Sequence, residues 1–274
     1  MECELESIKI YYEQFGEGRP IIMLHGWLVD HRHMVKDFEP LFKHRDGWKR
    51  IYPDMPGMGQ TKGEQWIDSQ DQMLDILLEF IDTVIPEQQF CVVGTSHGGY
   101  LAQGVVYKRA DQMSGVFLMT PAQTTDITKR DLPPNVTLVR DEVLISELEP
   151  DEAEFFEEFA VVQSRALLES LRRDVFPAIE IADHGFLEKL EKSIEFSFDI
   201  TALPERFDKP SLILLGRQDS VVGYSNAWHI LDKYPRATFA VLDRAGHGLG
   251  VEQRQLFIAL ANEWLDRVEE GVGL

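Results

Sequence analysis

A serine near the first third of the chain has the surroundings of an enzyme nucleophile. Residues 92–100 read Val-Val-Gly-Thr-Ser-His-Gly-Gly-Tyr, which gives the pattern Gly-x-Ser-x-Gly around Ser96. An apolar run precedes the pattern and a helix-like stretch follows it, so the serine is expected on a sharp turn between a strand and a helix. The glycines on either side lack the Cβ atoms that so tight a turn would crowd. The pattern therefore predicts that Ser96 is a nucleophile.

A serine hydroxyl needs a base within hydrogen-bond reach, and that base needs an acid to orient it. His97 is adjacent to Ser96, but neighbouring helical residues point in different directions, so its side chain is not expected to be the base. His247 follows the predicted strand Thr238–Leu242 in a loop flanked by glycines. The carboxyl ends of parallel strands share one edge of a sheet, where Ser96 is also expected. We predict that His247 is the base. Solvated or internally bonded side chains are expected for His31, His33, His44, His184 and His229.

The acid is sought at the same edge of the sheet. Asp219 comes shortly after the apolar run 211–215, whereas Asp243 and Asp199 are rivals. Asp243 is so close to His247 in sequence that reaching the imidazole would need a tight loop, and Asp199 ends a different segment. We favour Asp219, which gives the order serine, aspartate, histidine along the chain.

The composition is that of a globular protein with an acidic surface. The chain has 274 residues, 44% of them hydrophobic, which is enough for one large α/β domain, with or without an inserted lid. Forty-seven acidic residues against 27 basic ones give a formal net charge of −20. Such a surface is repelled by phosphate backbones and by anionic membranes, so neither nucleic acid nor a membrane is an expected partner.

Signals for export, disulfides and metals are weak. No apolar run approaches the ~20 residues that span a bilayer, and the N-terminus is acidic, unlike a secretory signal. We therefore expect a cytoplasmic protein. Cys3 lies near the terminus and Cys91 in a predicted core strand, so a disulfide is not expected, and no Cys/His spacing suggests zinc.

Strand and helix patterns alternate over much of the chain, which predicts an α/β fold with a mostly parallel central sheet and helices on both faces. Strands are expected at Ile8–Phe15, Ile21–Leu24, Ile51–Tyr52, Phe90–Val93, Val116–Met119, Ser211–Leu215 and Thr238–Leu242. Helices are expected at Met34–Phe42, Ile67–Val84, Gly99–Ala110, Ser225–Lys233 and Leu256–Val268.

The alternation stops from about Pro121 to Leu203. This stretch has helical patterns, including a helix over Glu152–Leu171, and an acidic belt over Glu147–Glu158. The simplest account is a helical cap, residues 121–205, inserted between two strands of a core formed by residues 1–120 and 206–274. Its aromatic residues are expected mostly to bury the cap against the core, and some to wall a pocket: Phe155, Phe156, Phe159, Phe176 and Phe186.

Four motifs in this order make the chain resemble the α/β-hydrolase family, in its capped serine hydrolase branch. Leu24-His25-Gly26-Trp27 is similar to the family's oxyanion loop, Asp54-Met55-Pro56-Gly57-Met58-Gly59 to its D-x-P-G-x-G loop, Gly216–Val222 to its acid loop and Ala245-Gly246-His247 to its histidine loop. The resemblance implies that the backbone N–H groups of Trp27 and His97 form an oxyanion hole. It also implies that His25 braces the oxyanion loop. The Trp27 side chain is expected either to wall the acyl site or to pack under the cap.

Departures from the family patterns narrow the expected chemistry. Ser96 stands where the haloalkane dehalogenase and epoxide hydrolase branches use aspartate. The loop after Leu24 has neither the HGGG form of one lipase and esterase branch nor the H-G-x-G-P-G form of hydrolases that act on aromatic ring-fission products. We expect a serine hydrolase that needs no cofactor or metal and acts through an acyl-enzyme on a small carboxylic ester, thioester or lactone. The alternatives are a carbon–carbon bond hydrolase of a vinylogous diketone and a non-catalytic ligand-binding relative; a homodimer is left open.

The charge of the substrate can also be anticipated. The acidic belt and the net charge of −20 should slow anionic substrates, so a neutral acyl group is expected. A local arginine in the pocket would reverse this preference, and Arg130, Arg165 and Arg172 are the candidates.

Overall fold

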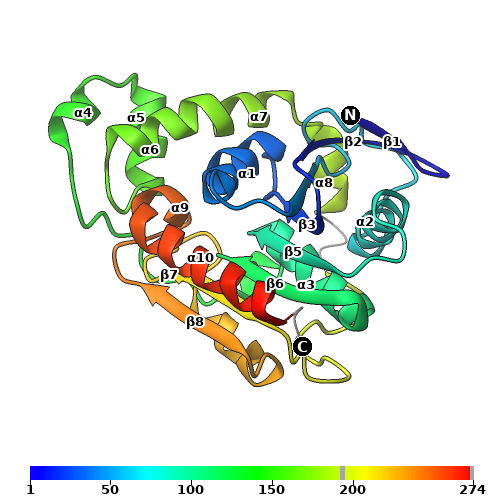
Figure 1. Cartoon of the computed structure of the whole chain (residues 1–274). Helices are drawn as coiled ribbons and strands as arrows, with labels where there is room; N and C mark the ends of the chain where they lie inside the picture. The colour runs from blue at the N-terminus through cyan, green and yellow to red at the C-terminus, as the bar shows by residue number, and fades with distance from the viewer. Residues whose placement is uncertain (192–194, 272–274) are drawn as a thin grey trace.

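The computed structural model describes residues 1–191 and 195–271, and an eight-stranded sheet runs through its centre (Figure 1). The strand order is β1-β2-β4-β3-β5-β6-β7-β8. β1 and β2 pair antiparallel with their neighbours, whereas β4, β3, β5, β6, β7 and β8 are parallel. The strands are β1 (Glu2–Glu4), β2 (Lys9–Phe15), β3 (Arg19–Leu24), β4 (Trp48–Pro53), β5 (Phe90–Thr95), β6 (Met113–Met119), β7 (Ser211–Gly216) and β8 (Ala237–Leu242). The predicted α/β class with a mostly parallel sheet is confirmed; the short β1 was not predicted.

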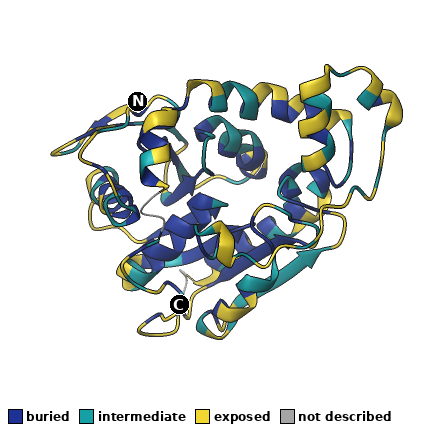
Figure 2. Ribbon diagram, turned by 180° about the vertical axis from the view of Figure 1, so that it is seen from behind, coloured by how far each residue is buried: buried dark blue, intermediate teal, exposed yellow. Residues whose placement is uncertain are grey.

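Helices cover both faces of the sheet, and for this reason the central strands are buried along their whole length and mostly apolar. Every residue of β5 and of β7 is buried. Side chains of one face pack against α2 (Gln70–Val84) and α3 (His97–Arg109), and those of the other face pack against α1 (His31–Phe38) and α10 (Arg254–Gly271). Figure 2 shows these central strands as buried, whereas β8 at the edge of the sheet is only partly buried.

Two helix boundaries differ from prediction because capping residues set them. α1 begins at His31, three residues before the predicted start, since the Asp30 side chain accepts a hydrogen bond from the Arg32 amide. It ends at Phe38 and continues as a 3₁₀ turn, η1 (Glu39–Phe42), which contains Pro40. α2 begins at Gln70 rather than Ile67, capped by the Ser69 hydroxyl.

The segment between β6 and β7 is helical, and its helices lie together along the upper side of the molecule in Figure 1. It contains η3 (Ile127–Lys129), α4 (Glu142–Ser146), α5 (Pro150–Phe159), α6 (Arg165–Ser170), the π-helical turn η4 (Leu171–Val175), α7 (Phe176–Ile181) and α8 (His184–Leu190). The predicted single helix Glu152–Leu171 is wrong. The backbone leaves the helix after Phe159, and the amides of Val161 and Val162 donate to the buried Glu252 carboxylate at 2.8 and 3.1 Å.

Three short elements remain: one follows α3 directly, and the other two lie in the C-terminal part of the chain. They are η2 (Ala110–Gln112), η5 (Ser225–Lys233), which is a 3₁₀ helix, and α9 (Leu249–Glu252), which the sequence patterns did not predict. Both cysteines are buried and free. Within the described ranges, no helix combines the length and the apolar character needed to cross a membrane.

Candidate active site

Ser96 lies on a strained turn between β5 and α3. Its φ of 53° and ψ of −120° place a non-glycine residue in a sparsely populated backbone region, which persists only where the surrounding structure enforces it. A Cβ on Gly94 would lie 2.2 Å from the Gly98 carbonyl oxygen, and one on Gly98 would lie 2.3 Å from the Leu24 carbonyl oxygen. These contacts explain why glycines flank the serine and how the turn projects its hydroxyl from the edge of the sheet.

The loops after β7 and β8 bring an aspartate and a histidine together. Asp219 Oδ2 lies 2.9 Å from His247 Nδ1. The other carboxylate oxygen, Oδ1, accepts the amides of Val221 at 2.9 Å and Val222 at 3.0 Å. Because the fully buried carboxylate can only accept here, His247 Nδ1 carries the proton and Nε2 is left as an acceptor.

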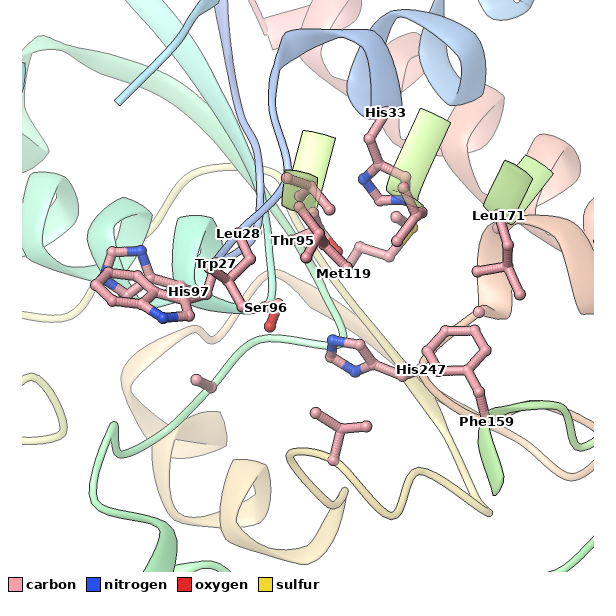
Figure 3. Close-up of a pocket in the computed structure, with 18 of the residues that line it drawn as sticks. Trp27, Leu28, His33, Thr95, Ser96, His97, Met119, Phe159, Leu171 and His247 are labelled. Atoms are coloured by element: carbon pink, nitrogen blue, oxygen red, sulfur yellow. The ribbon is translucent and has the colours of Figure 1, made fainter. Parts of the chain in front are cut away.

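Ser96 and His247 line the same cavity, which has a volume of about 720 Å³. In Figure 3 the Ser96 hydroxyl points toward the His247 ring. Most of the lining is apolar and comes from both the core and the helical segment: Trp27, Leu28, Val29, Met119, Ile127, Phe155, Phe159, Leu167, Leu171, Val175, Ile179, Val221 and Val251. The volume is that of a pocket for a small molecule.

The two backbone amides that the family resemblance assigns to an oxyanion hole, those of Trp27 and His97, make no hydrogen bond to an acceptor in the described part of the chain. His25 holds the first of these loops in place. Its Nε2 accepts the Met55 amide at 3.0 Å, so its Nδ1 carries the proton and donates to the Gly26 carbonyl oxygen at 2.8 Å. Both ring nitrogens are thus engaged in bracing, as the family resemblance implied.

The His97 side chain has a structural environment of its own. Its Nε2 lies 2.8 Å from Gln70 Oε1, which fixes the proton on Nε2. Burial lowers the pKa of His97 to about 3, so the ring stays neutral at physiological pH. The Trp27 ring packs edge-on against it, with centroids 4.8 Å apart, and lines the cavity. Gln70 and this pairing were not predicted, since they join α2 to α3 across 27 residues.

The rival acids lie elsewhere. Asp243 and Asp199 are exposed, and the Asp199 carboxylate accepts from the amide and hydroxyl of Thr201. His33 was expected to be solvated or bonded, but it lines the cavity, and its Nδ1 has no partner among the described residues. Asp37 also lines the cavity, with its Oδ2 3.8 Å from His33 Nε2, and was not predicted.

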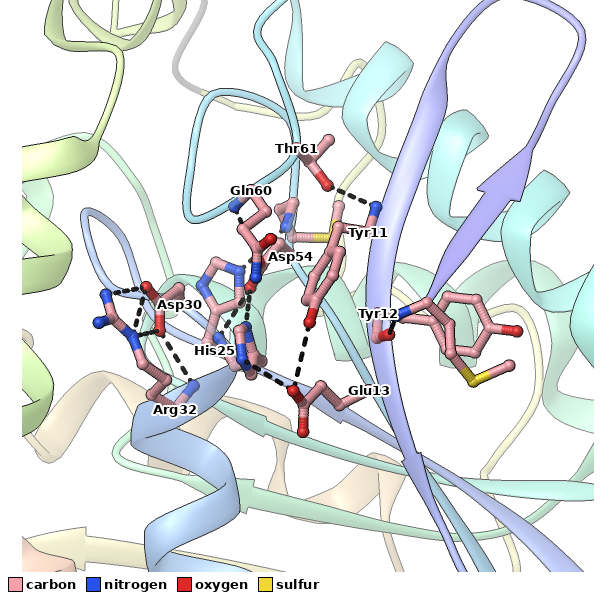
Figure 4. A network of polar contacts seen from close by, with 12 residues as sticks. Tyr11, Tyr12, Glu13, His25, Asp30, Arg32, Asp54, Gln60 and Thr61 are labelled. Carbon is pink, nitrogen blue, oxygen red and sulfur yellow. Dashed lines mark hydrogen bonds and ion pairs between the residues drawn. The ribbon is translucent and has the colours of Figure 1, made fainter.

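A polar network around the buried Asp54 carboxylate joins the loop after β4 to the start of α1 (Figure 4). Asp54 Oδ1 accepts both the amide and Nδ1 of His31 at 2.8 Å, and Asp54 Oδ2 accepts the Gln60 amide at 2.9 Å. Burial lowers the pKa of His31, but the hydrogen bond and charge of Asp54 outweigh that effect, and the net pKa is raised.

The raised pKa of His31 has a consequence for stability. The folded state binds this proton more tightly than the unfolded chain, so the stabilisation is complete below the ordinary histidine pKa of ~6.5 and is lost as pH rises through the raised value. We expect His31→Gln to remove this loss of stability with rising pH, measured by urea unfolding between pH 5.5 and 8.5. The exposed His229→Gln should leave it unchanged. Equal pH dependence in wild type and His31→Gln would contradict the assignment.

Glu252 joins the histidine loop to the helical segment. Its carboxylate accepts the Gly246 amide at 2.7 Å as well as the two amides after α5. Burial raises its pKa, and the three amides oppose that effect.

We expect Glu252→Gln to destabilise the fold by roughly 1–3 kcal/mol, because an amide group cannot accept at both positions and leaves a buried N–H unpaired. Activity should fall as well, since Gly246 precedes His247. The control is Glu263→Gln on α10, an exposed glutamate paired with Arg267, for which a change below about 0.5 kcal/mol is expected. Chemical denaturation of both variants checks this, and equal effects would rule out the bridging role.

The aromatic residues of the helical segment divide into two groups. Phe155 and Phe159 line the cavity, and the Phe159 ring lies edge-on to His247 with centroids 6.5 Å apart. Phe156 is fully buried inside the segment, and Phe186 packs against Gly57 of the D-x-P-G-x-G loop. Phe176 packs edge-on against Phe155.

Comparisons with known proteins identify the family and the fold. The model of the alpha/beta hydrolase family matches residues 21–260. A pimeloyl-[acyl-carrier protein] methyl ester esterase of Legionella pneumophila (strain Corby) is 22% identical over 264 residues, which cover 94% of this chain and 100% of that protein. The crystal structure of an alpha/beta superfamily hydrolase from Oenococcus oeni PSU-1 is 28% identical, covers 98% of this chain and 99% of its own, and has a TM-score of 0.89. An esterase from Exiguobacterium antarcticum has a TM-score of 0.72 at 20% identity, covering 94% of this chain and 96% of its own. The chain therefore belongs to the alpha/beta hydrolase family.

Proposed function

We propose that this protein is a serine hydrolase that cleaves a small carboxylic ester, thioester or lactone through an acyl-enzyme. One observation carries the proposal: a serine on a strained turn faces a cavity shared with a histidine whose Nδ1 is bonded to a buried aspartate. The resemblance to curated ester hydrolases supports it. The fold by itself does not, since one fold hosts many reactions.

In the proposed mechanism Ser96 Oγ attacks the carbonyl carbon while His247 Nε2 accepts the serine proton. Asp219 keeps the proton on Nδ1 and stabilises the imidazolium that forms. The carbonyl oxygen becomes an oxyanion, which receives the amides of Trp27 and His97. His247 then gives its proton to the leaving group, and a water molecule, deprotonated by the same histidine, releases the acid.

Residues 121–205 are proposed to act as a cap over a core formed by residues 1–120 and 206–274. The segment supplies pocket-lining side chains and rests on the core through specific contacts. Phe196 stacks on Tyr100, with ring centroids 4.4 Å apart, and Asp183 donates its amide to the Gly57 carbonyl oxygen at 2.8 Å. A cytoplasmic location stays a prediction, which cell fractionation tests. Whether the protein forms a homodimer is left open, and size-exclusion chromatography tests it.

A substrate panel tests the proposal. Wild type should hydrolyse several esters, lactones or thioesters of graded chain length, and Ser96→Ala should lose activity on all of them. A dienol-ketone belongs in the same panel. Turnover of that compound without turnover of any ester would replace the proposal with carbon–carbon bond hydrolysis. Binding of these compounds without turnover would indicate a ligand-binding relative.

A further inference from the structure

Arg130 brings a positive charge into the wall of the cavity. It follows η3 and is half-buried. Its guanidinium donates to three backbone carbonyl oxygens: Nε to Thr124 at 3.2 Å, Nη1 to Val221 at 2.9 Å and Nη2 to Thr125 at 3.4 Å. These bonds orient the guanidinium between the loop after β6 and the acid loop after β7, but neutral carbonyl groups do not cancel its charge. Nη1 and Nη2 each have one further N–H that these bonds do not use.

The Arg130 guanidinium has no ion-pair partner among residues 1–191 and 195–271. The two carboxylates that influence it are engaged elsewhere. Asp126 accepts from the amide and hydroxyl of Thr128 and pairs with Lys129 at 3.5 Å. Asp219 is bonded to His247 and to two amides. Burial lowers the pKa of Arg130, which is the effect expected when a cation leaves water without a counter-ion.

The other two candidate arginines differ from Arg130. Arg165 pairs with Glu147 at 2.7 Å and Arg172 pairs with Glu152 at 2.6 Å, and both arginine side chains are about half exposed, at 58% and 49%. They neutralise part of the acidic belt and do not line the cavity. Arg130 therefore stands out among the three as a cation that faces the pocket and lacks a carboxylate.

Thr125 places a second polar group in the wall of the cavity. The hydroxyl of Thr125 is buried and has no hydrogen-bond partner in the described part of the chain, and Thr125 also lines the cavity. A partly desolvated guanidinium and an unpaired hydroxyl are costly unless a ligand completes their bonds. A carboxylate fits both needs, since it only accepts hydrogen bonds and carries the opposite charge.

We propose that the substrate carries a carboxylate that binds Arg130, with Thr125 as a second donor, while its ester carbonyl lies at Ser96. This inference rests on the proposed function and names its substrate class, a monoester or monothioester of a dicarboxylic acid. It reverses the preference for a neutral substrate that the net charge alone predicts. A contact pair in a half-buried pocket is screened far less than the field of surface charges.

The test compares each carboxylate with an uncharged analogue of the same shape. Monomethyl esters of dicarboxylic acids with about two to six methylene groups are assayed beside their methyl ester carboxamides. We expect kcat/KM to favour the best carboxylate on the order of 10-fold or more, with the preference persisting at high salt. Arg130→Gln should remove the preference, chiefly by raising KM for the carboxylate, so that kcat/KM falls more for the carboxylate than for the carboxamide. Arg130→Lys should retain part of it.

Arg165→Gln is the matched control, because it removes the same charge from the surface outside the cavity. It should keep the full preference. Equal loss for both substrates in Arg130→Gln would show that Arg130 only holds the acid loop, and a wild-type preference for the carboxamide would overturn the proposal directly.

A binding experiment separates this inference from the proposed chemistry. Calorimetric titration of Ser96→Ala with the monomethyl ester and its carboxamide should show the same preference without turnover, and Arg130→Gln in that background should abolish it. Binding preference without ester hydrolysis by wild type would refute the hydrolase and keep the carboxylate site. Ester hydrolysis by wild type without any binding preference would support the hydrolase and refute the carboxylate site.

Discussion

Ester hydrolysis by Ser96→Ala is expected to fall by on the order of 10³ or more relative to wild type. The serine oxygen is the proposed attacking atom, and with alanine at this position only the oxyanion amides and binding would assist attack by water. Labelling by a fluorophosphonate should disappear in the same variant. Active-site titration followed by steady-state kinetics on the best ester of the panel measures both.

A second serine in the cavity provides the control. Ser170 lines the same cavity, but it lies on α6 rather than on the strained turn after β5, and its hydroxyl accepts a hydrogen bond from Lys36 Nζ at 2.5 Å. Ser170→Ala should therefore keep its labelling. Thermal melting must show that Ser96→Ala is folded, which we expect because alanine meets the same backbone geometry. Labelling of Ser96→Ala at the wild-type rate would sink the nucleophile assignment.

The parts of the site that could be predicted from the sequence share one feature: each follows an apolar strand within a few residues. Ser96, Asp219 and His247 lie directly beyond β5, β7 and β8, so a correct reading of those strands already places them at one edge of the sheet. The glycines at 94 and 98 were equally readable, because their reason is the local crowding of the turn. For these residues the local sequence pattern was enough to predict their position.

What could not be predicted depends on contacts between distant segments. The helix expected over 152–171 has a continuous apolar face, yet it breaks where two amides reach Glu252, about 90 residues further along the chain. The same carboxylate accepts the amide next to the catalytic histidine candidate. No pattern around position 160 signals this partner, because helix propensity yields to a buried acceptor that only the fold supplies.

Among the polar side chains of the pocket, Gln70 was missed for the same reason, whereas Arg130 was named only as one of three candidates. Gln70 and Arg130 stand in ordinary sequence surroundings, and whether an arginine is paired or free depends on which carboxylates the fold brings to it. The sequence could only name three candidates. The ion pairs of Arg165 and Arg172 and the carbonyl partners of Arg130 separate them.

Asp219→Asn is expected to reduce turnover by up to ~10⁴ while the protein stays folded. The amides of Val221 and Val222 are donors, so the new side chain should turn its carbonyl oxygen toward them. Its NH₂ group then faces His247 Nδ1, and the histidine can bond to it only by accepting. The proton moves to Nε2, and the ring can no longer take the proton of Ser96.

Asp243→Asn is the matched comparison, because it makes the same chemical change on the neighbouring loop. The Asp243 side chain is exposed, and its backbone carbonyl, which accepts from Gln218 at 3.1 Å, is untouched by the substitution. We expect its turnover to stay within about twofold of wild type, since a surface charge some residues from the imidazole is screened by water and salt. Stopped-flow or steady-state assays on one ester, with unfolding curves for both variants, decide between the two aspartates. If Asp243→Asn were the damaging change, or if Asp219→Asn kept a tenth of the activity, the 2.9 Å contact between Asp219 and His247 would not be the one that orients the base.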